Sequence, residues 1–118
     1  MALHPEFDDD MALIRRRKSL ATAKGGQAAP RLLLLAEHHD GGQATRIAGF
    51  IASTYNGQVF PFDRYELRTL DEAIADDMLL CIDALSWAQA DLHTLVPDGD
   101  RRVRAVLEQH GLKWPEEL

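Results

Sequence analysis

The sequence contains one cysteine among 118 residues, Cys81, so no internal disulfide can form. Nothing in the chain therefore points to an oxidising compartment. Long apolar runs are missing as well, because the run at residues 32–36 ends at Glu37 and no stretch is long enough to cross a bilayer. The first ten residues are acidic and contain no apolar segment, which predicts a cytoplasmic protein without a secretory signal.

Basic residues are outnumbered, since 13 Lys and Arg face 19 Asp and Glu and the formal net charge is −6. A negative chain is repelled by nucleic-acid phosphates and by anionic membranes, so neither is the expected partner. Apolar residues make up 46% of the chain and charged residues 27%, which is ordinary for a globular protein and argues against disorder of the whole chain. A chain of this length can bury a proper core without a metal.

The first 29 residues differ from the rest and are expected to form an extension. Acids at Asp8–Asp10 and bases at Arg15–Lys18 suit the dipole of a short helix that carries both. Lys24–Ala29, with two adjacent glycines, is typical of a flexible linker. We therefore predict an N-terminal extension over residues 1–29, with a short helix and this Gly-rich linker, and a helical domain over residues 30–118.

Helical periodicity runs through the predicted domain. A proline and four successive leucines predict a helix over residues 30–39, and apolar side chains at helical spacing predict others over about residues 43–55 and 100–110. The strongest pattern lies over residues 70–92, where apolar side chains recur every three or four positions. This apolar seam consists of Ile74, Met78, Cys81, Leu85, Ala88 and Leu92.

These elements predict an all-α fold of four to five helices, orthogonal or bundle-like, around a central helix over residues 70–92. Alternating polar and apolar side chains at residues 64–68 fit either a brief strand or a 3₁₀ turn. One strand without a partner cannot make a sheet, so at most one short strand is expected. The central seam could serve the core of one chain or the interface of a homodimer, and the sequence leaves both open.

Glu37-His38-His39-Asp40 is the first candidate site, because carboxylates and imidazoles bind divalent transition metals. Adjacent histidines on a helix point about 100° apart, so His38 and His39 cannot meet at one ion without a distant ligand. The favoured interpretation is a solvated helix end without a metal, and His38 and His39 stay weak candidates. A metal-dependent enzyme with Asp76 as a further ligand is the alternative.

An acidic row on the central predicted helix is the second candidate. Glu72, Asp76 and Asp83 fall within about 40° of one another on a helical wheel. Such a row can bind a basic partner, although rows of charge are more often simply solvated. We name these three residues as the predicted partner-binding site.

Basic side chains offer a third candidate, a DNA-associated regulator. Arg15–Lys18 form a compact basic cluster that could contact phosphates, although Asp8–Asp10 lie close enough to neutralise it. The helices over residues 40–55 and 98–110 could read DNA, with phosphates held by arginines. Those arginines are Arg46, Arg101, Arg102 and Arg104.

Enzyme motifs are missing from the chain. It has no Gly-x-Ser-x-Gly sequence, no phosphate-binding loop and no dinucleotide fingerprint. Cys81 lies between Met78 and Leu85 on the apolar seam, where a core residue is expected rather than a nucleophile. We identify no catalytic residue and no cofactor, which leaves activity open but favours a protein that is not an enzyme.

Several short motifs resemble a family of small uncharacterised proteobacterial proteins. They are Leu35–Gln43, Arg46–Ile51, Tyr55–Gly57, Phe62-Asp63, Leu67, Leu70-Asp71 and Ala75–Leu79. That family is a domain of unknown function often carried on plasmids and integrative elements, and the resemblance covers residues 31–92. It implies a mobile-element context and brings no catalytic residue with it.

The leading hypothesis is a non-enzymatic accessory or adaptor protein of a mobile genetic element that binds another, unidentified protein. An inhibitor of a host defence protein or nucleic-acid-binding protein is a special case, because a small acidic protein can compete for a basic channel. The DNA-associated regulator and the metal-dependent enzyme remain the alternatives.

Overall fold

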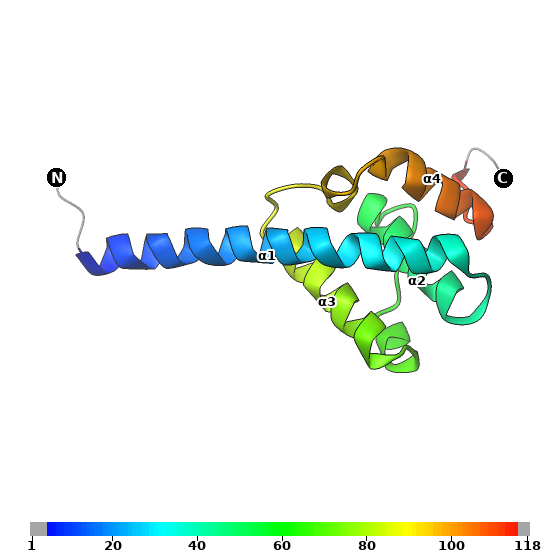
Figure 1. Cartoon of the computed structure of the whole chain (residues 1–118), viewed down its shortest axis with the longest axis horizontal. Coiled ribbons are helices and arrows are strands. Elements are labelled where there is room, and N and C mark those ends of the chain that lie inside the picture. The colour runs from blue at the N-terminus through cyan, green and yellow to red at the C-terminus, as the bar shows by residue number, and fades with distance from the viewer. Residues whose placement is uncertain (1–4, 116–118) are drawn as a thin grey trace.

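One long helix, α1 (Pro5–His38), runs the length of the molecule, and the other elements pack around its C-terminal half (Figure 1). This computed structural model describes residues 5–115; residues 1–4 and 116–118 of the two predicted segments lie outside it. The later elements are α2 (Gly42–Tyr55), the 3₁₀ helix η1 (Arg64–Thr69), α3 (Glu72–Ser86), the 3₁₀ helix η2 (Leu92–Leu95) and α4 (Gly99–Gln109). No strand occurs within the described residues, which confirms the all-α prediction.

The linker expected over residues 24–29 is wrong, because α1 continues through both glycines without a break. Gly25 is buried against α3, and a Cβ atom built on it would overlap the Cβ of Ala84. Only glycine lets the two helices approach this closely, which offsets its low helix propensity. Pro30, expected at a helix start, also lies inside α1.

The central helix is shorter than predicted, since α3 ends at Ser86 rather than near residue 92. Ala88 has a left-handed φ of 53°, which turns the chain away from the helix axis. Met78 and Cys81 of the predicted seam are buried as expected, and Leu92 reaches the core from η2 instead. The described seam therefore serves the core of one chain.

Residues 64–69 form η1, so the 3₁₀ alternative at this position is confirmed and the short strand is not formed. Asp63 precedes the turn, and its side chain accepts a hydrogen bond from the backbone N–H of Tyr65 at 2.9 Å. This is the local capping that aspartate supplies at the start of a helical turn.

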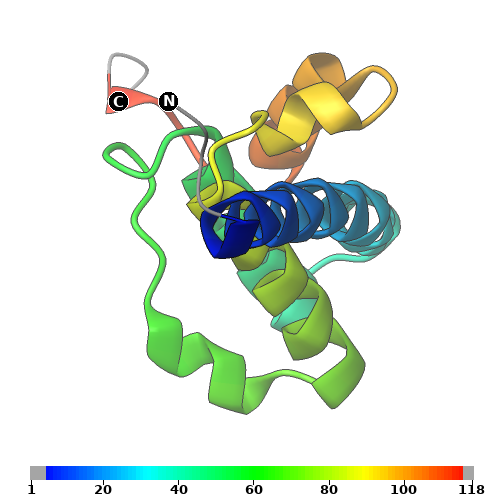
Figure 2. The ribbon, with the colours of Figure 1, turned by 90° about the vertical axis from the view of Figure 1, so that its left-hand side faces the viewer.

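A single core joins the four α-helices, with α3 and α4 on different sides of α1 (Figures 1 and 2). Its largest fully buried side chains are Leu32, Leu33, Ile47, Met78, Val106 and Cys81. An aromatic group closes one end, because Trp114 packs edge-on against Phe60 and Tyr55 with ring centroids 5.2 and 6.2 Å away. These edge-to-face contacts hold the C-terminal segment onto the core.

The N-terminal half of α1 projects from this body without a covering helix (Figure 1). We call residues 9–20 the arm. The molecule measures 58 × 32 × 25 Å with a radius of gyration of 16.5 Å, whereas a compact domain of this length has about 13–14 Å. The arm therefore accounts for an elongated shape, and the surfaces that position function are this arm and the helices of the body.

Candidate functional site

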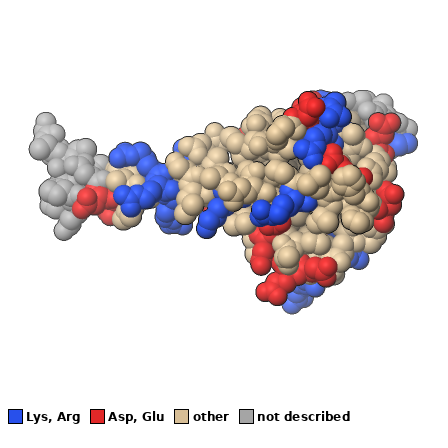
Figure 3. All heavy atoms as spheres, viewed as in Figure 1, with Lys and Arg blue, Asp and Glu red and all other residues tan. Residues whose placement is uncertain are grey.

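Helix α3 presents the predicted acidic row to solvent. Its inner side is fixed by the buried side chains of Met78, Cys81 and Ala84, so the opposite side must face outward. That outward side carries Glu72, Asp76 and Asp83, all exposed, together with Leu79 and Ile82, which are 52% and 40% exposed. We call these five residues the α3 outer face; acidic side chains are visible where α3 reaches the surface (Figure 3).

The three carboxylates of the α3 outer face form no ion pair within the described part of the chain. Their neighbour Asp77 behaves differently, because it accepts two hydrogen bonds from Arg31 of α1 at 2.8 and 3.0 Å. One acid therefore connects α3 to α1, whereas the three outer acids face solvent. Sequence periodicity located the acidic row, but it missed Ile82 as an exposed apolar neighbour.

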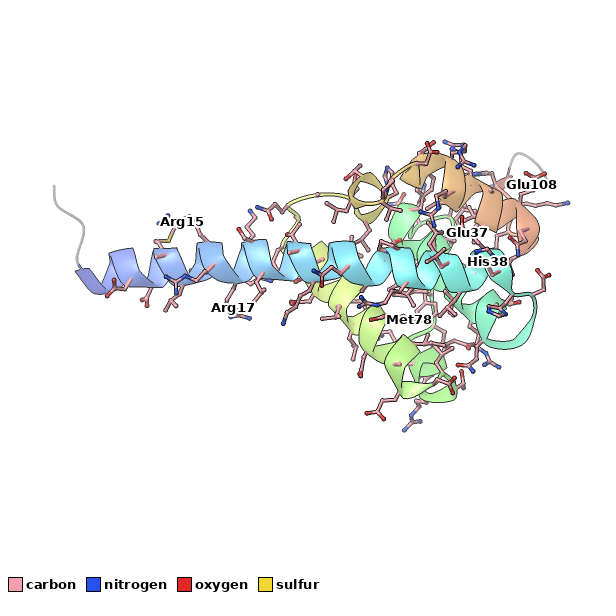
Figure 4. All side chains as sticks on the ribbon, viewed as in Figure 1. Arg15, Arg17, Glu37, His38, Met78 and Glu108 are labelled. Carbon is pink, nitrogen blue, oxygen red and sulfur yellow. The ribbon has the colours of Figure 1, made fainter. Side chains whose placement is uncertain are left out.

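The candidate metal residues are not brought together. Glu37 of α1 accepts two hydrogen bonds from Arg102 of α4, at 2.7 and 3.0 Å, and these bonds hold the pKa of Glu37 below its usual value. His38, the last residue of α1 (Figure 4), and His39, which follows it, are both exposed. Among the residues that the structure describes, no group of three or more His, Cys, Asp or Glu side chains is arranged to hold a metal.

The arginines proposed to contact DNA are already engaged. Each one of the four forms an ion pair with a carboxylate, and a phosphate would have to displace that carboxylate. The pairs are Arg46–Glu66 at 3.2 Å, Arg101–Asp98 at 3.0 Å, Arg102–Glu37 at 2.7 Å and Arg104–Asp100 at 3.2 Å. This pairing weakens the case for α2 or α4 as a DNA-reading helix.

The basic cluster lies on the arm, which projects from the body (Figures 3 and 4). Arg15, Arg16 and Arg17 are exposed and Lys18 is half-buried. The guanidinium of Arg17 lies 5.4 Å from the ring centre of Trp87, at the end of α3, which is a cation–π distance. Arg15 and Arg17 point to opposite sides of the arm, so the cluster is spread around the helix (Figure 4).

Long-range polar contacts that the sequence did not predict hold α4 against the end of α1. The Nε2 of Gln109 donates to the backbone oxygen of Ala36 at 3.1 Å, and the Nε2 of His110 lies 2.8 Å from the same oxygen. The hydroxyl of Tyr55 donates to Asp100, which raises the pKa of Tyr55 and lowers that of Asp100. These side chains satisfy helix ends and fix α4, so they are structural.

The interior offers little room for a substrate. An apolar cavity of about 30 Å³ lies between α1, α2 and η2, bordered by Leu32, Phe50 and Cys81 among others. Ligand pockets usually measure about 300–1,000 Å³, so this space is too small for one. Larger hollows lie at the surface, among them one of about 410 Å³ bordered by Arg31, His38, His39 and Asp77. Burial raises the pKa of the Cys81 thiol to about 12, which keeps it protonated and unreactive.

Comparison with known proteins gives one match. No curated protein and no solved structure matches the chain. Within the described residues, no helix combines the length and apolar character needed to cross a membrane. A model for a family of unknown function matches residues 26–111, from the middle of α1 to just beyond α4, which is most of the chain. The chain therefore belongs to the family of unknown function DUF7673.

Proposed function

We propose that this protein is a non-enzymatic accessory or adaptor protein that acts by binding another protein through the α3 outer face. One observation supports this most strongly: three exposed carboxylates that form no ion pair with a described base share the outer side of α3 with exposed Leu79, and exposed Ile82 lies beside them. Burial of apolar area drives protein association, and charges beside it select the partner and speed its approach. The matching partner carries a basic surface with an apolar patch.

We further propose that the protein is the accessory protein of a mobile genetic element. Inhibition of a host defence protein or another nucleic-acid-binding protein is the special case that the acidic surface favours. Such partners hold phosphates in basic channels, and a small protein of net charge −6 can compete for such a channel. Direct DNA binding is the less favoured function, because the arginines of α2 and α4 are paired with carboxylates.

A retrieval experiment with matched charge reversals tests the proposal. The wild-type protein is immobilised and challenged with extract of its native host, in parallel with Asp76→Lys/Asp83→Lys and with Asp91→Lys/Glu108→Lys. All four positions are exposed, and both double variants change the net charge equally. Glu72 is left intact because its carboxylate stabilises the first turn of α3.

We expect the wild type and the Asp91/Glu108 variant to retrieve the same protein. The Asp76/Asp83 variant should retain at least about tenfold less of it, since like charges now face the partner. Higher salt should weaken the wild-type complex. Retrieval of no specific protein, or equal retrieval by both double variants, would refute binding through the α3 outer face.

A further inference from the structure

The arm continues the buried face of α1 beyond the point where α3 ends. In the body, buried residues Ala21, Gly25, Ala28 and Leu32 recur at steps of four and three and face the core. The same steps, continued toward the N-terminus, reach Lys18, Ile14 and Met11. Ile14 is 45% exposed and Met11 36% exposed, so one apolar seam is covered in the body and uncovered on the arm.

The arm gains little stability from packing. Most helix stability in proteins comes from packing of the apolar face, and the apolar side chains of the arm are exposed. The arm contacts the body near residue 20, where Arg17 lies over Trp87. A helix that carries an exposed apolar seam is therefore expected to gain a covering helix.

The charges of the arm are complementary to those of a second arm. Asp10 and Arg17 are seven residues apart, two full turns, and so lie on the same flank of the seam. In an antiparallel pair of helices, residues on the same flank of the two seams face each other. When Met11 of one arm lies opposite Ile14 of a second copy, Asp10 of each copy faces Arg17 of the other.

We propose that two copies of this chain pair antiparallel through their arms. The Met11–Ile14 contacts form the apolar centre of the interface, and the two Asp10–Arg17 pairs flank it. The resulting interface is isologous, the common form in homodimers. A parallel pair is disfavoured, because Lys18 of one copy would face Lys18 of the other within the seam.

The interface is small, so the expected dimer is weak. Two helices of this length bury an area at the low end of specific interfaces, below about 1,200 Å². A dissociation constant in the micromolar range is therefore expected. This inference depends on the arm alone and is independent of the proposed role of the α3 outer face.

Sedimentation velocity over about 0.5–500 µM full-length protein tests it, because that range lies on both sides of a micromolar constant. The test variants are Asp10→Arg and Arg17→Asp, each of which places like charges across both flanking pairs. The matched controls, Asp9→Arg and Arg16→Asp, make the same changes on the side of the helix away from the seam. All four positions are exposed, so circular dichroism should show a folded helical body in each variant. Arg17→Asp also loses the contact with Trp87, whereas Asp10→Arg keeps it, so the two test variants must agree.

We expect the wild type and both controls to dimerise with concentration, and each test variant to dimerise at least about tenfold more weakly. An equimolar mixture of the two test variants should recover the dimer, because one copy then carries only bases at both positions and the other only acids. A wild type that stays monomeric overturns the proposal. So does a mixture that fails to recover, or a dimer of Arg17→Asp alone, which a parallel pair would allow.

Discussion

Replacement of the two adjacent glycines of α1 by alanine should change stability in opposite directions. Alanine favours a helix over glycine by about 1 kcal/mol, so the intrinsic gain is the same at both sites. The surroundings differ. A Cβ on Gly26 would lie 3.7 Å from the Cβ of Leu95, an ordinary contact, whereas a Cβ on Gly25 would overlap the Cβ of Ala84.

The free-energy cost of Gly25→Ala depends on which atoms can move to relieve the overlap. Carbon atoms pack at about 3.5–4.0 Å, so the overlap must be relieved by separating α1 from α3. Ala84 is attached directly to its backbone and has no rotamer to change, which places the cost near the upper end of the usual 1–3 kcal/mol for overpacking. After the helix gain is subtracted, Gly25→Ala should be destabilised by about 2 kcal/mol, and Gly26→Ala stabilised by about 0.5–1 kcal/mol.

Urea unfolding followed by circular dichroism measures both free energies. The double variant Gly25→Ala/Ala84→Gly supplies the control, because it removes the atom that the new Cβ meets. The double variant should be destabilised by less than the sum of the effects of Gly25→Ala and Ala84→Gly measured separately. If Gly25→Ala is as stable as the wild type, or if both single variants agree within about 0.5 kcal/mol, α1 and α3 do not approach as described.

Two further predictions concern the body. Cys81 should not react with a thiol reagent at pH 8 in the native protein and should react fully in denaturant, because burial raises its pKa to about 12; rapid native labelling would contradict its place under α1. Glu37→Gln should lower the free energy of unfolding by about 1–2 kcal/mol at neutral pH by removing the charged bonds to Arg102. Because the pKa of Glu37 is lowered in the folded state, this contribution is complete above the unfolded value near 4.5 and disappears as pH falls through the folded value. A difference between wild type and variant that stays constant down to pH ~3 would contradict the ion pair.

The spacing of apolar residues correctly predicted which side chains of a single helix are buried and which are exposed. The buried positions of Met78 and Cys81 and the exposure of Asp76 and Asp83 follow from the 3.6-residue turn. The prediction was wrong where the structure depends on a residue far away in the sequence. Two adjacent glycines are typical of a linker, and only the packing of Ala84 against Gly25 explains why they lie inside a helix. The left-handed turn at Ala88 has no local signal either, since alanine is the best helix former.

The sequence pattern could not predict contacts between segments that are distant in the chain. The Arg102–Glu37 pair joins α4 to α1, and the Arg31–Asp77 pair joins α1 to α3. No spacing rule connects these residues, because their separation is set by how the helices pack. Their pairing engages the carboxylate of Glu37, one of the residues considered for a metal site, and the guanidinium of Arg102, one of those considered for phosphate contact.

The part of α1 that the family match covers differs from the part that forms the arm. The match begins at residue 26, beside Gly25, where α1 is already packed on α3. The arm, residues 9–20, projects beyond the body, so paired arms would hold two bodies at opposite ends of one helical rod. Each dimer would then present two α3 outer faces. A partner with two basic patches, itself a dimer or a repeating assembly, would bind both faces at a raised effective concentration, and modest contacts at each face would give a durable complex.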